Sequence, residues 1–225
     1  MKKLPWIQSI KFLCFDVDGT LYRDVPAAWE AIQSQIYGTV MEHRKCSLSE
    51  AQKYVRRRYQ KLGSSTKVLN ELGIDGQEFF NRAFTAIDLK QYVSGDPKLL
   101  RLLEKLKSKY RLGIISNNSL PIVSKKLDAI GVPLNIFDPI VTTYELGVMK
   151  PDPDPFLKAL ELARVSPDEA IYIGDKEETD ILGAKAVGMR TIMVWGKSKH
   201  ADLSIPTIYS LERILLGVRQ GESLK

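Results

Sequence analysis

The sequence predicts an α/β fold: a parallel sheet with helices on both faces and a helical insertion after the first strand. Short apolar segments alternate with amphipathic helical segments over most of the 225 residues, which is typical of a parallel sheet with helical crossovers. Between residues 26 and 88 this alternation stops and only helical periodicity remains. The length suits one domain of about 150 residues that carries such an insertion.

The first strand and the inserted helices come first along the chain. We expect a strand over residues 10–15, where a run of β-forming apolar residues precedes an acidic turn. Ser47 followed by Glu50 has the spacing of a capping box and marks the start of the second inserted helix. The four inserted helices are expected at residues 27–43, 48–63, 65–72 and 75–87.

Strands and helices alternate after the insertion. Because parallel strands joined by right-handed crossovers end at the same edge of the sheet, a ligand is expected at that edge. The insertion begins just after the first strand, at the carboxyl end where a ligand is expected, so it is placed to act as a lid. The expected strands span residues 112–116, 140–142, 170–174 and 191–194, with an edge strand at 207–208. The expected helices span residues 97–110, 121–130, 155–163, 179–187 and 211–218.

The composition narrows the class of protein. The formal net charge of +6 favours anionic ligands, either phosphorylated small molecules or nucleic acid. No recognisable nucleic-acid-binding module is present, so nucleic acid is not an expected partner. The two cysteines, Cys14 and Cys46, indicate neither a disulfide framework nor a zinc site. We expect no signal peptide, no membrane-spanning segment and a cytoplasmic location.

Two carboxylates, Asp16 and Asp18, follow the first expected strand. In an extended chain, side chains two residues apart point to the same side, so the two charges would lie close together. Such a pair is stable when a cation lies between the carboxylates or when they share a proton. A hard divalent cation such as Mg2+ prefers oxygen ligands of this kind. An acidic loop with an ordinary Asp-Gly turn is the alternative, and the pair alone favours it.

Three further segments place polar residues near the ends of expected strands. Ser116 and Asn117 could bind phosphate oxygens through side-chain and backbone donors. Lys150 precedes a proline, which keeps it on a loop, where it could neutralise a phosphoryl group. Asp175 could supply another metal ligand, and Asp180 could orient Lys150 or a metal-bound water. Singly, each has an ordinary explanation: a helix cap, a solvated lysine or an acidic helix start.

In this order the four segments resemble the motifs of the haloacid dehalogenase-like hydrolase superfamily. The first motif, Asp-x-Asp-Gly-Thr, is met by residues 16–20, and the second, a strand ending in Ser or Thr, by Ser116. The third, Gly-x-x-Lys-Pro, is met by residues 147–151, and the fourth, Gly-Asp-x-x-x-x-Asp, by residues 174–180. The resemblance covers the whole chain.

This resemblance implies a Rossmann-like doubly wound parallel sheet core, with a helical C1 cap domain inserted after the first strand. The core would comprise residues 1–22 and 93–225, and the cap residues 23–92. A cap of this size favours small phosphorylated metabolites, and the protein is expected to be a monomer or a homodimer. Candidate cap contacts with the substrate are Tyr22, Arg23, Trp29, Tyr54, Arg58, Tyr59 and Lys61.

The resemblance also implies a role for each acidic residue. Asp16 is expected to be the nucleophile that attacks a phosphoryl group and forms an aspartyl phosphate. Asp18 is expected to be the general acid/base, which protonates the leaving alkoxide and then activates water. Mg2+ is expected to be held by Asp16, the backbone carbonyl of Asp18 and Asp175. Asp180 is expected to position Lys150 from the second shell around the metal.

The expected phosphate-binding residues come from the same motifs. Ser116 and Lys150 would bind oxygens of the transferring phosphoryl group, with help from the backbone at Gly19 and Asn117. The resemblance therefore implies a Mg2+-dependent hydrolase of small phosphate monoesters, with a nucleotide or a sugar phosphate as the substrate.

Three alternatives remain open at this point. A β-phosphoglucomutase-like phosphotransferase would need a cap that donates a proton to an intermediate, and His43 is the only histidine in the expected cap. The 2-haloacid dehalogenases resemble Asp-x-Tyr-Gly-Thr instead, because a carbon–halogen bond needs no leaving-group proton. Asp18 therefore favours a phosphatase. A non-catalytic binding protein on the same fold has no need of a nucleophile and an acid together.

Overall fold

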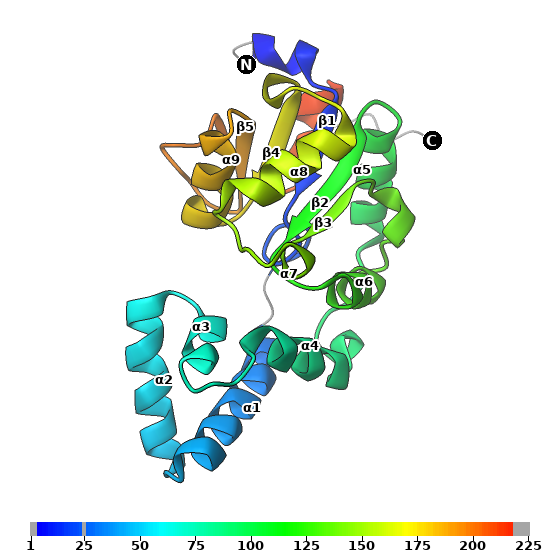
Figure 1. Ribbon diagram of the computed structural model, residues 1–225. Helices are drawn as coiled ribbons and strands as arrows, with labels where there is room; N and C mark the ends of the chain where they lie inside the picture. The colour runs from blue at the N-terminus through cyan, green and yellow to red at the C-terminus, as the bar shows by residue number, and fades with distance from the viewer. Residues whose placement is uncertain (1–3, 24–25, 218–225) are drawn as a thin grey trace. The chain divides into compact units, whose positions relative to one another are not determined.

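A computed structural model describes residues 4–23 and 26–217 of the chain. Among these residues, a parallel sheet has the strand order β3-β2-β1-β4-β5-β6 (Figure 1). The predicted α/β fold with a parallel sheet is therefore confirmed. The strands are β1 (Phe12–Phe15), β2 (Arg111–Ser116), β3 (Ile140–Thr142), β4 (Ala170–Gly174), β5 (Arg190–Val194) and β6 (Leu203–Ile205).

The position of β1 in the sheet determines where a ligand can bind. β1 lies between β2 and β4. The chain first moves outward from β1 through β2 to β3, and later returns to β4 on the other side of β1, so the strand order reverses there. In open parallel sheets, ligands bind beside such a reversal, at the carboxyl ends of the strands. The loops after β1 and β4 are thus the expected place for an active site.

β1 is buried on both faces, which explains its continuously apolar sequence. Phe12 and Cys14 pack in a cluster with buried residues of α8 (Pro153–Ala163) and α9 (Leu182–Ala186). Figure 1 shows α8 lying across the strands. The two side chains that alternate with Phe12 and Cys14 point to the opposite face and are equally buried. The sheet is therefore the middle layer of its unit, with α5 (Pro97–Lys107) packed against β2.

The edge strand differs from the prediction. A strand is expected at residues 207–208, but β6 spans Leu203–Ile205 and pairs with β5. Pro206 follows β6 directly and has no backbone N–H to continue the pairing, so the strand ends before it. Ile208 is fully buried by packing instead. The prediction for residues 207–208 is therefore wrong.

Two expected helices contain π-helical turns. The helix expected at residues 179–187 begins with such a turn at Glu177–Ile181 and continues as α9. The helix expected at 211–218 is a π-helical turn at Glu212–Leu216, and residue 218 lies outside the described residues. The remaining helices around the sheet are α6 (Leu120–Ala129) and α7 (Thr143–Leu146), with short 3-10 turns at Pro5–Ser9, Leu134–Ile136 and Pro167–Glu169.

The chain divides into two compact units. The core unit comprises Met1–Asp24 and Ser94–Lys225 and contains the sheet, and the helical unit comprises Val25–Val93. No helix within the described ranges is long and apolar enough to cross a bilayer. The helical unit contains α1 (Pro26–Arg44), α2 (Leu48–Leu62), α3 (Ser65–Asn70), α4 (Gly76–Ala86) and a 3-10 turn at Leu89–Gln91.

Local sequence explains how the helices of the helical unit are delimited. Ser47 and Glu50 form the predicted capping box: the Ser47 N–H donates to Glu50 Oε2 at 2.9 Å, and the Glu50 N–H donates to the Ser47 hydroxyl. α2 ends at Leu62, and the C-cap that follows it is Gly63, whose φ of 68° suits glycine. Arg58 of α2 then forms an ion pair with Glu71, with Nε 2.6 Å from Oε2. The pair links α2 to the segment after α3.

Candidate active site

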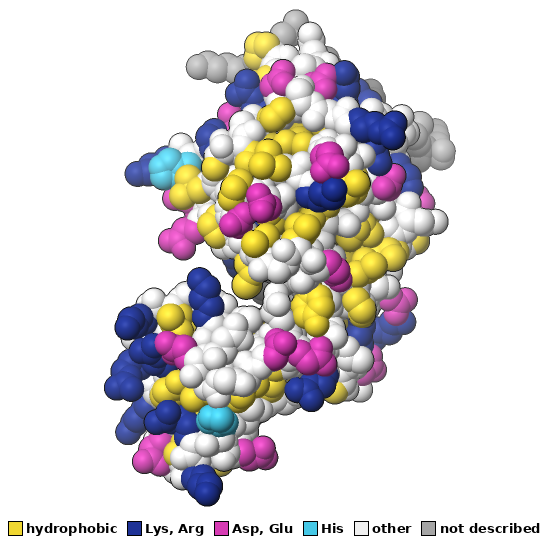
Figure 2. All heavy atoms as spheres, viewed as in Figure 1, with side chains coloured by type: hydrophobic (Ala, Val, Ile, Leu, Met, Phe, Trp, Pro, Cys, Tyr) yellow, Lys and Arg dark blue, Asp and Glu magenta, His cyan; other side chains and the backbone are white. Residues whose placement is uncertain are grey.

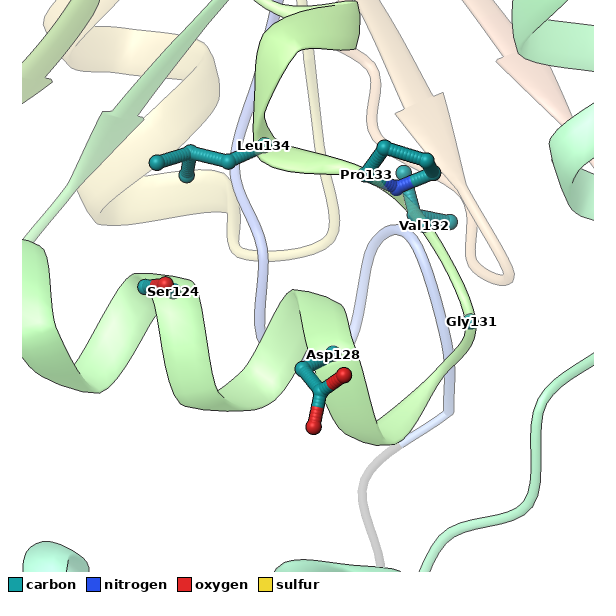
Figure 3. A pocket seen from close by; sticks show the side chains of 6 residues that line it. All are labelled: Ser124, Asp128, Gly131, Val132, Pro133 and Leu134. Atoms are coloured by element: carbon teal, nitrogen blue, oxygen red, sulfur yellow. The ribbon is translucent and has the colours of Figure 1, made fainter.

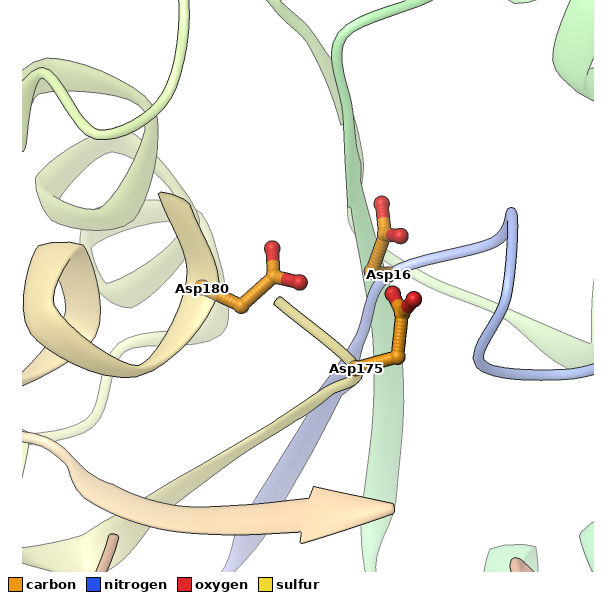
Figure 4. A group of neighbouring side chains, drawn as sticks. All are labelled: Asp16, Asp175 and Asp180. Atoms are coloured by element: carbon orange, nitrogen blue, oxygen red, sulfur yellow. The ribbon is translucent and has the colours of Figure 1, made fainter. Parts of the chain in front are cut away.

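The loops after β1 and β4 carry the acidic residues of the site. The Asp16 N–H extends the pairing of β1 with β4 by donating to the carbonyl of Ile173 at 3.0 Å. Asp175 directly follows Gly174, the last residue of β4. Neighbouring parallel strands therefore bring Asp16 and Asp175 to one edge, and Asp180 joins them from the next turn (Figure 4). Ligand oxygens of these three carboxylates lie within 4.8 Å of one another.

Gly19 allows the first loop to approach Asp175 closely. Its φ is +75°, a conformation that residues with a side chain rarely adopt. A Cβ at this position would lie 2.3 Å from Oδ2 of Asp175. The hydroxyl of Thr20 donates to Oδ1 of the same carboxylate at 3.4 Å. The loop after β1 therefore both makes room for Asp175 and holds it.

Lys150 is a buried cation in contact with two of the three carboxylates. It is 5% exposed, and its Nζ donates to Oδ1 of Asp16 at 2.8 Å and to Oδ1 of Asp180 at 2.7 Å. The third donor of the ammonium group meets the hydroxyl of Tyr172 at 2.7 Å. The backbone N–H of Lys150 donates to Oδ1 of Asn117 at 2.9 Å. Because each N–H has an acceptor, the cost of burying this charge is offset.

Burial and charge act in opposite directions on this cluster. Burial raises the pKa of Asp16 to about 7, with Lys150 lowering it and Asp180 raising it. Burial alone would lower the pKa of Lys150, but the carboxylates of Asp16 and Asp180 raise it above its ordinary value. Burial and the same carboxylates raise the pKa of Tyr172, so its hydroxyl stays neutral. The raised pKa of Asp16 indicates that burial, together with the neighbouring carboxylates of Asp180 and Asp18, outweighs the attraction of Lys150.

Asp180 is fully buried, and both of its oxygens accept hydrogen bonds. Oδ1 accepts from Lys150 and, at 3.3 Å, from the hydroxyl of Tyr172. Oδ2 accepts from the backbone N–H of Lys176 at 3.0 Å. A Cβ on Gly174 would lie 2.4 Å from the Cβ of Asp180, so a glycine at the end of β4 makes this approach possible. Asp180 thus contacts the lysine that it is expected to position.

β2 ends at the same edge of the sheet in polar residues. Ser116 is 1% exposed, and its hydroxyl accepts from the backbone N–H of Asn118 at 3.2 Å and from Nδ2 of Asn118 at 3.1 Å. Asn117 uses its side-chain oxygen to hold the backbone of Lys150. Asn117 therefore contacts Lys150, and Ser116 is linked to Asp18 through Asn118. The contact of Ser116 and Asn117 with phosphate stays a prediction.

Asp18 contacts three donors of the core unit. Oδ2 accepts from Nζ of Lys126 at 2.6 Å and from Nδ2 of Asn118 at 2.9 Å, and Oδ1 accepts from the hydroxyl of Tyr22. Burial alone would raise the pKa of Asp18, but the charge and hydrogen bond of Lys126 and the hydrogen bond of Tyr22 lower it below its ordinary value. The pKa values of Asp16 and Asp18 are thus shifted in opposite directions, because burial dominates at Asp16 while donors dominate at Asp18.

The donor set of the acidic cluster fits a hard divalent cation. Carboxylate oxygens are the ligands that Mg2+ prefers, and a cation would offset the repulsion that Asp180 and Asp18 exert on the carboxylate of Asp16. Both oxygens of Asp180 already accept hydrogen bonds, so Asp16 and Asp175 are better placed as ligands. Within the described residues, the carboxylate of Asp18 is not part of the cluster. Metal binding by the Asp18 backbone carbonyl stays a prediction.

Three residues of the site, Tyr172, Asn118 and Lys126, are not among those identified from the sequence. Tyr172 lies inside an apolar strand, where a packing role is the ordinary interpretation. Asn118 adjoins the second motif but has no motif position of its own. The sequence does contain a sign that Lys126 is buried, because this lysine lies four residues after Ile122, on the apolar side of an amphipathic helix.

The seven candidate cap contacts are divided between the two units. Tyr22 and Arg23 belong to the core unit, where Tyr22 contacts Asp18 and the guanidinium of Arg23 lies 5.8 Å from the ring centroid of Trp195. The other five belong to the helical unit: Trp29, Tyr54, Arg58, Tyr59 and Lys61.

Within the helical unit, several of these residues have internal partners. Trp29 stacks on Phe80 and Phe84, with ring centroids 6.2 and 6.3 Å away, and the guanidinium of Arg44 lies 4.3 Å from the ring centroid of Tyr54. Figure 2 shows Lys and Arg side chains gathered over α2. Their contact with a substrate stays a prediction. The exposed basic residues of α2 are Lys53, Arg56, Arg57 and Lys61.

A hollow of about 480 Å³ lies beside α6 (Figure 3). None of the predicted site residues lines it, so it is separate from the acidic cluster. Its lining residues are Ser124, Asp128, Gly131, Val132, Pro133 and Leu134.

Known proteins are similar to this chain over most of its length. The sequence profile of the haloacid dehalogenase-like hydrolase family matches residues 13–194. The chain is 30% identical over 208 residues to the glyceraldehyde 3-phosphate phosphatase of Methanopyrus kandleri, covering 86% of this chain and 87% of the relative. It is 28% identical over 202 residues to the phosphoglycolate phosphatase of Aquifex aeolicus, covering 84% and 87%. The crystal structure of a HAD phosphatase from Thermococcus onnurineus superposes with a TM-score of 0.71 and 26% identity, covering 93% of this chain and all of that one (100%).

Proposed function

Because this chain belongs to the haloacid dehalogenase-like hydrolase family, we propose that it is a Mg2+-dependent phosphatase of small phosphate monoesters. One observation carries the proposal: a second carboxylate, Asp18, lies two residues after Asp16 and is held by three donors. The leaving group of a phosphate ester is an alkoxide, which needs a proton, whereas a halide ion leaves without one. The phosphatase activity named for the relatives supports the same conclusion.

In the first step, the carboxylate of Asp16 attacks phosphorus and forms an aspartyl phosphate. The bond between phosphorus and the ester oxygen breaks, and Asp18 gives a proton to the departing alkoxide. Lys150 holds Asp16 at 2.8 Å and supplies a positive charge beside the transferring group. Ser116, at the end of β2, would bind a phosphoryl oxygen.

In the second step, water attacks the aspartyl phosphate and Asp18 takes up a proton from it. The bond between phosphorus and the Asp16 oxygen breaks, so phosphate leaves and the Asp16 carboxylate is restored. Asp16 and Asp175 would hold Mg2+ with the backbone carbonyl of Asp18. When bound, the cation supplies charge neutralisation between the carboxylates and the phosphoryl oxygens. Asp180 keeps Lys150 in place throughout.

We propose a small phosphorylated metabolite as the substrate, with a sugar phosphate ahead of a nucleotide. The relatives are named for glyceraldehyde 3-phosphate and phosphoglycolate, which are both short phosphorylated carbon chains. In this proposal the helical unit acts as a cap that excludes large substrates and water. A β-phosphoglucomutase-like phosphotransferase stays as the second candidate, because it would share the Asp16 and Asp18 chemistry.

The test is a panel of phosphate monoesters assayed with the purified full chain. The panel comprises glyceraldehyde 3-phosphate, phosphoglycolate, a nucleotide and p-nitrophenyl phosphate. Phosphate should be released from these esters in the presence of Mg2+, and EDTA should stop the release. Transfer of the phosphoryl group between sugar positions without phosphate release would favour the phosphotransferase. Halide release from 2-chloropropionate, with no phosphate release from any ester, would contradict the proposal.

Gly19→Ala is expected to lower Mg2+-dependent phosphate release by about tenfold or more, because the added Cβ would meet Asp175 at 2.3 Å. Gly217→Ala is the matched control. Gly217 has the same φ of +75°, but a Cβ there would have nothing within 4 Å. Both variants should lose about 1–2 kcal/mol of stability through the backbone, and only Gly19→Ala should raise the Mg2+ concentration needed for half-maximal rate. Equal effects of the two variants on activity would contradict the role of this contact.

A further inference from the structure

A lysine is buried on the apolar side of α6. Lys126 is 3% exposed and lies among buried residues of the same helix, including Ile122, Val123 and Leu127. Lysine is rarely buried unless its charge is paired, because the ammonium group loses its hydration. The pairing group is the carboxylate of Asp18, 108 positions away in the sequence and 2.6 Å away in space.

The donors around Asp18 are of two kinds. Oδ2 accepts from Lys126 and from Nδ2 of Asn118, and both of these groups can only donate. Oδ1 accepts from the hydroxyl of Tyr22, which can also accept a hydrogen bond if it rotates. A proton on Oδ2 would face two N–H donors, whereas a proton on Oδ1 could be directed at the Tyr22 oxygen. The two oxygens of Asp18 are therefore not equivalent.

From this asymmetry we propose that Lys126 is a positioning residue, which anchors Oδ2 of Asp18 and so presents Oδ1 for proton transfer to the leaving group. The proposal rests on the proposed phosphatase function and assigns a residue that no sequence motif of the site includes. Lys126 touches no reacting atom in this scheme, and it acts through the orientation of Asp18. Its loss should therefore impair the proton transfer and leave the attack by Asp16 intact.

The test compares a substrate that needs leaving-group protonation with one that does not. Glyceraldehyde 3-phosphate releases a basic alkoxide, whereas p-nitrophenyl phosphate releases a stable phenolate. In Lys126→Met, kcat/KM for glyceraldehyde 3-phosphate should fall by about 100-fold, and kcat/KM for p-nitrophenyl phosphate by less than about threefold. kcat/KM is chosen because it reports the steps up to formation of the aspartyl phosphate, before water attack.

Two further variants complete the experiment. Lys126→Gln keeps a neutral donor and should give a smaller loss of the same selective kind. It also provides the measurement if Lys126→Met does not fold. Lys185→Met is the control, because it removes another ion pair between a helix lysine and an aspartate, that with Asp202 at 3.2 Å. It should leave kcat/KM unchanged for both substrates.

The outcomes separate this inference from the proposed function. Equal losses on both substrates in a folded Lys126 variant, or no loss on either, would overturn the positioning role while the wild type remains a phosphatase. A wild-type chain that hydrolyses neither substrate would instead remove the proposed function, and this inference with it.

Discussion

Asp16→Asn is expected to abolish phosphate release, with a loss of about 10⁴-fold or more in kcat. The amide is neutral and cannot form the aspartyl phosphate, so neither step of the proposed cycle can occur. The substituted side chain has nearly the same shape, and its oxygen can still accept from Lys150, 2.8 Å from the present carboxylate oxygen. Phosphate release with Mg2+ is the measurement.

The same substitution should not destabilise the protein in EDTA. Burial raises the pKa of Asp16 above its ordinary value, so ionisation of this carboxyl at neutral pH costs folding free energy. Removing the charge should therefore leave the unfolding midpoint at pH 7 unchanged or raise it. Asp138→Asn, at an exposed carboxylate paired with Arg111, should affect neither activity nor stability. Substantial turnover in a folded Asp16→Asn variant would disprove the proposed nucleophile.

Lys150→Met is expected to have the largest effect on stability. The change removes the ammonium group that contacts both Asp16 and Asp180 and leaves two buried carboxylates without it. Breaking a buried ion pair from one side costs about 3–5 kcal/mol, because the remaining charge stays desolvated. For a chain of this size, that loss corresponds to a fall of roughly 10 °C in the unfolding midpoint of the core unit. Calorimetry in EDTA measures it.

Lys158→Met is the matched control for this prediction. Lys158 also contacts a carboxylate, that of Glu161 at 2.9 Å, but its side chain is 40% exposed. Exposed pairs contribute little, so the control should change stability by less than about 1 kcal/mol. Phosphate release should be lost in Lys150→Met and kept in Lys158→Met. Similar stability in the two variants would contradict the view that Lys150 neutralises the cluster.

Sequence reasoning works well where the structure is decided locally. The strand before Asp16 and the capping box of Ser47 depend on neighbouring residues, and both are present. The edge strand is wrong because Thr207 and Ile208 have suitable side chains for a strand, while the preceding Pro206 stops the pairing.

The partners of the site residues are decided by packing between distant segments. Tyr172 meets Lys150 because its side chain lies on the face of the sheet that α8 covers, and Lys150 is on the loop that leads into α8. Lys126 meets Asp18 because α6 follows β2, a neighbour of β1. The two strands that flank β1 cannot be predicted from the spacing of apolar residues, since strand order depends on crossovers rather than on local periodicity.

By itself, the sequence determined the chemical groups of this protein and their order along the chain. The reactivity of the site belongs to the side chains of Asp16, Asp18, Lys150 and Asp175. The local sequence pattern is enough to place these residues on loops near the ends of strands. Only the tertiary structure decided which groups pair: Lys150 with Asp16, 134 positions apart, and Lys126 with Asp18. The physical reason is that a buried charge must find its partner within a few ångströms, and the order of the strands sets which distant side chains come that close.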